Sequence, residues 1–222
     1  MKKNGFMRYI VFPALALIMT LPACASVSQR AEDPDAERAW TCDEDADRAL
    51  MEDDLEAGIR LHEEFLESHP DNALALYHLG YAYGRIEDHE REIACYERAQ
   101  ALGYTDGDFL FNLGMAYGET GATEKAVKTI QMAVDEEPDN ADYRVGLGLA
   151  LERSGKIYAA AGALEEAVRL DPMLPDARWF LVRIYVETDR LEPARVHLQD
   201  LLEIDPDHPQ ARGLLQELEA MD

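Results

Sequence analysis

The stretch NLGMAYGETGATEKAVKTIQMAVDEEPDN, from Asn112 to Asn140, indicates the fold because a similar stretch follows it in the chain. The second version, GLGLALERSGKIYAAAGALEEAVRLDPML, runs from Gly146 to Leu174 and follows the first at the interval that separates Leu113 from Leu147. A Leu-Gly pair comes early in both, alanines follow, and an acidic residue with a proline comes near the end. A period of this length indicates stacked supersecondary units.

The period extends beyond these two copies. A Leu-Gly pair recurs at Leu79, Leu113 and Leu147, and Leu181-Val182 follows at the same interval. The same interval separates Tyr83, Tyr117, Leu151 and Tyr185, then Ala99, Ala133, Ala167 and Leu201, and finally Pro138, Pro172 and Pro206. It also separates Ala126, Ala160 and Ala194, with Glu92 as the odd member of that column. Several columns that recur in phase predict one repeated helix pair.

Elementary packing explains which residues recur. A large and a small side chain placed together, as in Leu113-Gly114, let a second helix approach closely. Ala126 and Ala133 offer the same small surface from the second helix, together with Ile130. Gly121 marks the turn between the helices, and Pro138 ends the unit because a proline disfavours helix at the residue before it. These columns therefore predict the fold and say nothing of the function.

The pattern resembles the tetratricopeptide repeat, over roughly residues 43 to 220. The resemblance implies an all-α, right-handed superhelix of about five helix–turn–helix repeats. The expected units are 39–72, 73–106, 107–140, 141–174 and 175–208, followed by a cap helix within 209–222. The first unit is the weakest match, since its first half is acidic and lacks the Leu-Gly pair.

The start of the chain has a different composition. A basic beginning and an apolar stretch are typical of a signal peptide over 1–23. The sequence LPAC, ending at Cys24, resembles the lipobox of bacterial lipoproteins, which implies a lipid on Cys24 and a flexible tether over 24–38. Ala25 after the cysteine favours the outer membrane, by the same resemblance. The alternative is cleavage after Ala25, which would leave a soluble periplasmic protein.

Charge and motif content narrow the function. A net charge of −24 argues against nucleic acid, and leaves the lipid anchor as the only expected membrane contact. No phosphate-binding loop, nucleophile elbow or zinc-protease motif occurs, so neither catalysis nor a cofactor or metal is expected. The six histidines show no ligand spacing, and we interpret them as surface residues. Whether Cys42 and Cys95 form a disulfide stays open.

The first helices of such arrays line the concave face, where partners bind. Aromatic and Met side chains suit partner surfaces, and arginines could hold a carboxylate. The alternative is that the aromatics pack between helices or on the C-terminal segment, and that the arginines pair with local acids. The predicted groove residues are Tyr77, Tyr81, Arg85, Phe111, Met115, Val145, Leu149, Arg153, Trp179 and Arg183.

The leading hypothesis is a lipid-anchored periplasmic adaptor that binds an extended or helical protein segment. The overall plan resembles the repeat lipoproteins that assist secretin and pilus assembly, such as type IV or Tad pilus pilotins. The same architecture serves outer-membrane protein insertion and the scaffolding of peptidoglycan enzymes. Two further alternatives are a soluble regulatory subunit and a hydrolase with unrecognised catalytic carboxylates.

Overall fold

A computed structural model describes residues 43–220, and all regular secondary structure in this range is helical. The expected all-α repeat architecture is confirmed. The predicted signal peptide, the tether, Cys24 and Cys42 lie outside the described residues. The helices are α2 (Glu44–Met51), α3 (Leu55–Ser68), α4 (Ala73–Arg85), α5 (His89–Ala101), α6 (Gly107–Glu119), α7 (Thr123–Glu136), α8 (Ala141–Arg153), α9 (Ile157–Leu170), α10 (Pro175–Glu187), α11 (Leu191–Ile204) and α12 (Ala211–Glu219).

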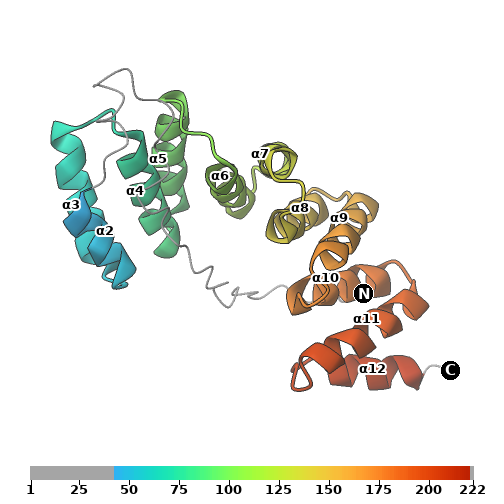
Figure 1. The fold of residues 1–222 in the computed structure, drawn as a ribbon. Coiled ribbons are helices and arrows are strands. Elements are labelled where there is room, and N and C mark those ends of the chain that lie inside the picture. Colours follow the sequence, from blue (N-terminus) through green and yellow to red (C-terminus); the bar gives the residue numbers. More distant parts are fainter. Residues whose placement is uncertain (1–42, 221–222) are drawn as a thin grey trace, which may run out of the picture.

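The helices pair in chain order and follow one another along an arc (Figure 1). The first helices of the pairs, α4, α6, α8 and α10, lie on the inner side of the arc, and the second helices lie outside them. Contacts between α4 and α6, and between α6 and α8, join these three inner helices in one layer. The last helix, α12, packs on α11 and ends the array.

Short polar side chains start most of the inner helices. Asp43, Asn72, Asp106 and Asn140 each accept a hydrogen bond from a backbone N–H in the first turn of the helix that follows. Such caps satisfy amide groups that have no partner within the helix. The inner helix α10 begins with Pro175 instead, whose missing N–H needs no partner.

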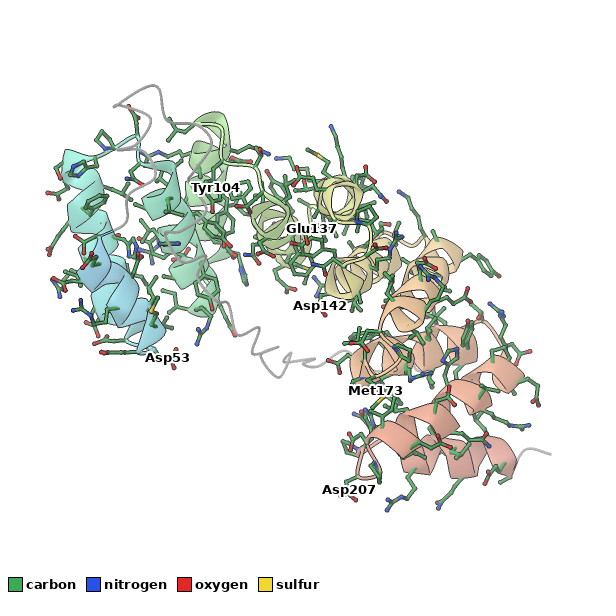
Figure 2. The ribbon with its side chains drawn as sticks, in the orientation of Figure 1. Asp53, Tyr104, Glu137, Asp142, Met173 and Asp207 are labelled. Atoms are coloured by element: carbon green, nitrogen blue, oxygen red, sulfur yellow. The ribbon has the colours of Figure 1, made fainter. Side chains whose placement is uncertain are left out.

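The turn inside each helix pair uses one left-handed residue. Asp53, Glu87, Gly121, Gly155 and Asp189 recur at the repeat interval and have φ between 57 and 79°. Figure 2 shows Asp53 at the first of these turns. Glycine adopts this conformation without steric cost, whereas Asp and Glu do not. The glycines at two of the five turns therefore mark a backbone requirement that all five share.

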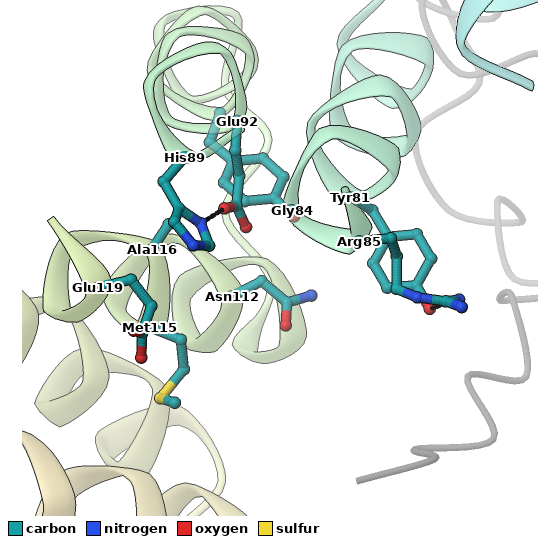
Figure 3. A pocket seen from close by; sticks show the side chains of 10 residues that line it. Tyr81, Gly84, Arg85, His89, Glu92, Asn112, Met115, Ala116 and Glu119 are labelled. Carbon is teal, nitrogen blue, oxygen red and sulfur yellow. Dashed lines mark hydrogen bonds and ion pairs between the residues drawn. The ribbon is translucent and has the colours of Figure 1, made fainter. Parts of the chain in front are cut away.

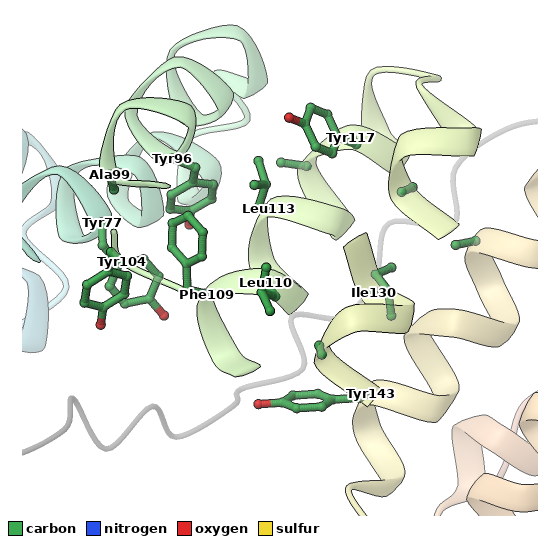
Figure 4. Close-up of a cluster of buried hydrophobic side chains, with 14 of the residues drawn as sticks. Tyr77, Tyr96, Ala99, Tyr104, Phe109, Leu110, Leu113, Tyr117, Ile130 and Tyr143 are labelled. Atoms are coloured by element: carbon green, nitrogen blue, oxygen red, sulfur yellow. The ribbon is translucent and has the colours of Figure 1, made fainter. Parts of the chain in front are cut away.

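The Leu-Gly columns bring the paired helices into contact. A Cβ added at Gly114 would lie 2.4 Å from Ile130 Cγ1, and one at Gly148 would lie 2.7 Å from Leu164 Cγ. Gly80 meets the ring of Tyr96 in the same way. The leucines of the column are all buried. Between the second and third units the core becomes aromatic, with rings from Tyr77, Tyr96, Tyr104 and Phe109 in contact (Figure 4).

Candidate functional site

A pocket of about 170 Å³ opens where α4, α5 and α6 meet (Figure 3). Cofactor and drug-sized ligands occupy clefts of roughly 300–1,000 Å³, so this volume suits a single side chain or small group. The lining combines aromatic and thioether surface with polar groups. It consists of Tyr81, Gly84, Arg85, His89, Glu92, Tyr96, Asn112, Met115, Ala116 and Glu119.

Glu92 is the unusual residue of the pocket because the three later units carry alanine at its place in the repeat, and the first unit carries Gly58. Gly84 makes room for it, since a Cβ there would lie 2.5 Å from Glu92 Oε1. Glu92 Oε2 lies 2.8 Å from Nδ1 of His89. Burial raises the pKa of Glu92 to about 7, although His89 opposes the shift and Glu119 adds to it. The pocket thus contains a carboxyl group that changes its charge near neutral pH.

The three arginines of the predicted groove are bound to acidic side chains. Arg85 donates to Asp53 Oδ1 at 2.7 Å and to the Tyr81 hydroxyl at 3.3 Å. The two others reach back to the preceding inner helix. They are Arg153, which donates to Glu119 at 2.9 Å, and Arg183, which donates to Glu152 at 2.8 Å. Each cation is therefore already neutralised, and Arg153 and Arg183 link neighbouring inner helices.

The predicted groove residues divide into three groups. Tyr81, Arg85 and Met115 line the pocket. Tyr77 and Val145 are buried in the core and present almost no surface to a partner. The others lie along the inner helices, and all of them except the exposed Arg153 are partly buried. Phe111 stacks on Tyr143, and Trp179 lies against His208 of the C-terminal segment.

Asn112 and Met115 continue the site along the inner face. Asn112 Nδ2 donates to the Tyr77 hydroxyl at 2.9 Å, which couples the pocket to the aromatic core. Met115 lines both this pocket and a smaller hollow bounded by Gly118, Leu149 and Arg153. The inner face thus offers successive depressions at neighbouring repeat junctions.

Sequence reasoning missed most of the polar groups of the pocket. His89 and Glu92 line it but were not predicted to face the groove, and only Glu92, in a column of alanines, departed from the repeat. The interpretation of all histidines as surface residues was also wrong. His62 and His78 are buried, and they lie beside Asp47 where α2, α3 and α4 meet.

Cys95, a free cysteine in the described part of the chain, is not reactive. Cys95 is buried on α5, and burial raises its pKa to about 11, so that it carries almost no thiolate at neutral pH.

Among the described residues, no helix has both the length and the apolar character needed to cross a membrane.

Comparison with known proteins agrees with the repeat geometry. One tetratricopeptide-repeat family model matches residues 45–106 and 111–172, and a second matches 151–218. The chain belongs to the tetratricopeptide-repeat family. Its fold is that of a protein–protein interaction scaffold.

Solved structures show the same arrangement at low sequence identity. YrrB, described as a tetratricopeptide-repeat protein with an unusual peptide-binding site, has a TM-score of 0.69 and 23% identity, over 77% of this chain and 88% of its own. MamA of Desulfovibrio magneticus RS-1 has a TM-score of 0.70 and 20% identity, over 74% and 93%. A thermophilic repeat protein of Thermus thermophilus has a TM-score of 0.60 and 19% identity, over 79% and 95%. No curated protein matches the sequence.

Proposed function

We propose that this chain is an adaptor that binds an extended segment of another protein along its inner face. One observation carries the proposal, namely the pocket between α4, α5 and α6 with its buried carboxyl group. Tyr81, Tyr96 and Met115 give apolar surface around Glu92. Aromatic and Met side chains of this kind are enriched in protein interfaces. The volume of about 170 Å³ suits one anchoring side chain of a peptide.

The anchoring side chain is basic in this proposal. Arg85 and Arg153 are held by carboxylates and do not attract a further acid. The carboxyl group of Glu92, by contrast, has only His89 as its hydrogen-bond partner among the described residues. A lysine or arginine in the pocket would complete the pairing of Glu92 and favour its charged form. The net charge of −24 would attract such a partner over a longer range.

Photo-crosslinking tests the groove directly. A photoreactive phenylalanine analogue in place of Met115, on the inner face, is expected to capture a protein partner in cells. The same analogue in place of Tyr158, which is 78% exposed on the outer helix α9, is the matched control and is expected to capture none. Equal capture at both positions, or capture at Tyr158 alone, would move the binding surface away from the inner face.

The chemistry of the anchor is tested with the captured partner. Glu92→Gln should weaken binding of the partner peptide by about tenfold or more, because a charge-assisted hydrogen bond is lost. The exposed neighbour substitution Glu90→Gln should leave the affinity unchanged. Equal affinities for wild type and Glu92→Gln would refute the basic anchor while leaving the groove in place.

We further propose that the adaptor lies in the bacterial envelope, on the basis of the segment that ends at Cys24. In this proposal Cys24 carries lipid, the protein faces the periplasm from the outer membrane, and the partner belongs to a pilus or secretion assembly. The support is the signal-peptide composition and the LPAC sequence. Several acyl chains give stable anchoring, since each buried methylene contributes about 0.8 kcal/mol.

Metabolic labelling tests the anchor. A palmitate analogue should label the wild type and not Cys24→Ala, and the variant should leave the membrane fraction. If the wild type is unlabelled, the chain is a soluble periplasmic protein and the groove proposal is unaffected. The identity of the crosslinked partner then separates pilus or secretion assembly from outer-membrane insertion and peptidoglycan scaffolding.

A further inference from the structure

Two histidines and an aspartate from three different helices meet near the start of the described chain. Asp47 lies on α2, His62 on α3 and His78 on α4. Asp47 Oδ1 is 3.2 Å from His62 Nε2 and 2.7 Å from His78 Nδ1. One ligand atom from each residue lies within 4.8 Å of the others. The cluster is separate from the groove pocket, which is lined by α4, α5 and α6.

The place of His62 in the repeat is unusual. Residues at the same place in the next four units are large, apolar and fully buried. They are Tyr96, Ile130, Leu164 and Leu198. His62 is equally buried, so the first unit has a titratable ring where its neighbours have core. Packing alone does not require an imidazole there, because a leucine fills the same place in two units.

The hydrogen-bond geometry of His62 leaves its Nε2 atom facing an acceptor. Its Nδ1 lies 2.9 Å from the backbone carbonyl oxygen of Gly58, which only accepts, so Nδ1 carries the proton. In neutral imidazole the Nε2 atom is then a bare lone pair, and it faces Asp47 Oδ1, which is also an acceptor. These two acceptors repel each other unless a proton or a metal ion bridges them.

The same geometry is typical of metal-binding histidines. Such residues donate their other ring N–H to a carbonyl or carboxylate, which fixes the tautomer and points the free nitrogen at the ion. His62 makes this contact with Gly58. His78 points Nδ1 at Asp47, while its buried Nε2 has no hydrogen-bond partner among the described residues. The orientation of the His78 ring is therefore set by what Nδ1 contacts.

We propose that Asp47, His62 and His78 bind a divalent transition-metal ion, and that Zn²⁺ suits this donor set. Two imidazole nitrogens and one carboxylate oxygen favour Zn²⁺ and its neighbours over Ca²⁺ or Mg²⁺, which prefer oxygen. Three protein ligands leave a further position for water or another group. This inference is independent of the proposed adaptor function.

Such an ion would stabilise the first unit, which is the weakest match to the repeat. The short helix α2 buries only Ala46, Ala49 and Leu50. The core cluster against which α3 packs is also small. An ion held by α2, α3 and α4 joins the first unit to the second through bonds rather than apolar area. Binding energy at a site that exists only in the folded chain is also folding energy.

Zinc titration of the purified, chelator-treated chain tests the proposal. Wild type is expected to bind one Zn²⁺ per chain by calorimetry and to melt at a higher temperature when zinc is present. Ca²⁺ and Mg²⁺ should give neither binding heat nor a change in melting temperature. His62→Leu is the informative variant, since leucine fills this place in other units. It should stay folded by circular dichroism and bind zinc about 100-fold more weakly.

His69→Ala is the matched control, because His69 is an exposed histidine on the same stretch of chain, and it should bind zinc as wild type does. Co²⁺ gives a second readout, with visible absorption bands in wild type and in His69→Ala that His62→Leu lacks. The proposal is overturned if wild type binds no zinc, or if His62→Leu retains wild-type affinity or cobalt bands. In the first case a hydrogen bond, and not a metal ion, joins His62 to Asp47.

Discussion

At the residue scale, Gly114 decides how closely two helices pack. Even a methyl group at this position would meet Ile130 Cγ1 at 2.4 Å and the Ile130 backbone nitrogen at 3.1 Å. The side chain can turn away, but the backbone contact cannot relax without moving α7. Gly114→Leu should therefore lower the free energy of unfolding by about 1–3 kcal/mol, measured by urea denaturation.

Gly162 is the control for this substitution. It is an exposed glycine inside α9 with nothing within 4 Å of an added Cβ. Gly162→Ala should raise the free energy of unfolding by up to about 1 kcal/mol, because alanine is the better helix former. If both substitutions destabilise the chain equally, close helix approach at Gly114 is not the cause.

At the same scale, Glu92 should make the stability of the folded chain depend on pH. Its folded pKa of about 7 lies above its ordinary value of 4.5. Between these values the folded chain keeps a proton that the unfolded chain has released, so stability falls as pH rises through this window. Below it both states hold the proton, and above it both have lost it. His89 on α5 and Glu119 on α6 are the charged neighbours that modulate the effect.

Glu92→Gln removes this titration. The loss of unfolding free energy between pH 5 and pH 8 should be smaller in the variant than in wild type by about 2–3 kcal/mol. Chemical denaturation at the two pH values measures it. Glu90→Gln, an exposed carboxylate on the same helix, should keep the pH dependence of wild type. A wild-type pH dependence in Glu92→Gln would show that other groups cause it.

At the element scale, the five turns within the helix pairs share one backbone conformation but not one residue type. Gly121 and Gly155 fit the positive φ, whereas Asp53, Glu87 and Asp189 adopt it at a cost. Glu87→Gly should therefore raise the free energy of unfolding by about 0.5–1 kcal/mol. Gly121→Ala should lower it by about 1–2 kcal/mol. Thermal melts of both variants measure the pair, and equal signs would contradict the assignment of strain.

The sequence predicted the contacts within the helix pairs, but not all contacts of the groove residues. Leu-Gly pairs, alanine columns and turn glycines recur because the two helices of each unit pack closely in the same way. The spacing of these residues was therefore enough to predict the helix pairs and their contacts. The groove contacts do not recur, and each depends on its neighbours. Tyr77 was expected in the groove, but it lies in the core because Tyr104 and Phe109 add rings beside it.

The histidine cluster shows the same limit more sharply. Asp47, His62 and His78 are far apart in sequence and come from three helices. No spacing rule for one helix or loop would connect them. One signal was available, since His62 stands in the column of Tyr96 and Ile130. Both His62 and Glu92 differ in type from the residues at the same place in other units. Such exceptions indicate candidate sites better than the repeated residues do.

At the scale of the whole molecule, the array needs an ending because each unit buries its face on the next one. The last helix, α12, serves this purpose on α11. Ala211 and Leu218 are buried in the core cluster that includes Leu198 and Leu201, and Arg195 donates to the Leu218 carbonyl oxygen at 2.6 Å. The surface beneath α12 is therefore core that the rest of the described chain leaves uncovered.

A charge on the inner side of α12 should uncover that surface. Leu218→Asp is expected to lower the free energy of unfolding by about 2–4 kcal/mol and to promote self-association through the exposed face of α11. Urea denaturation and light scattering measure the two effects. Glu217→Asp places the same side chain one position away, on the exposed side of the helix, and should change neither. If Leu218→Asp stays monomeric and as stable as wild type, α12 does not cap the array, and the core must end at α11.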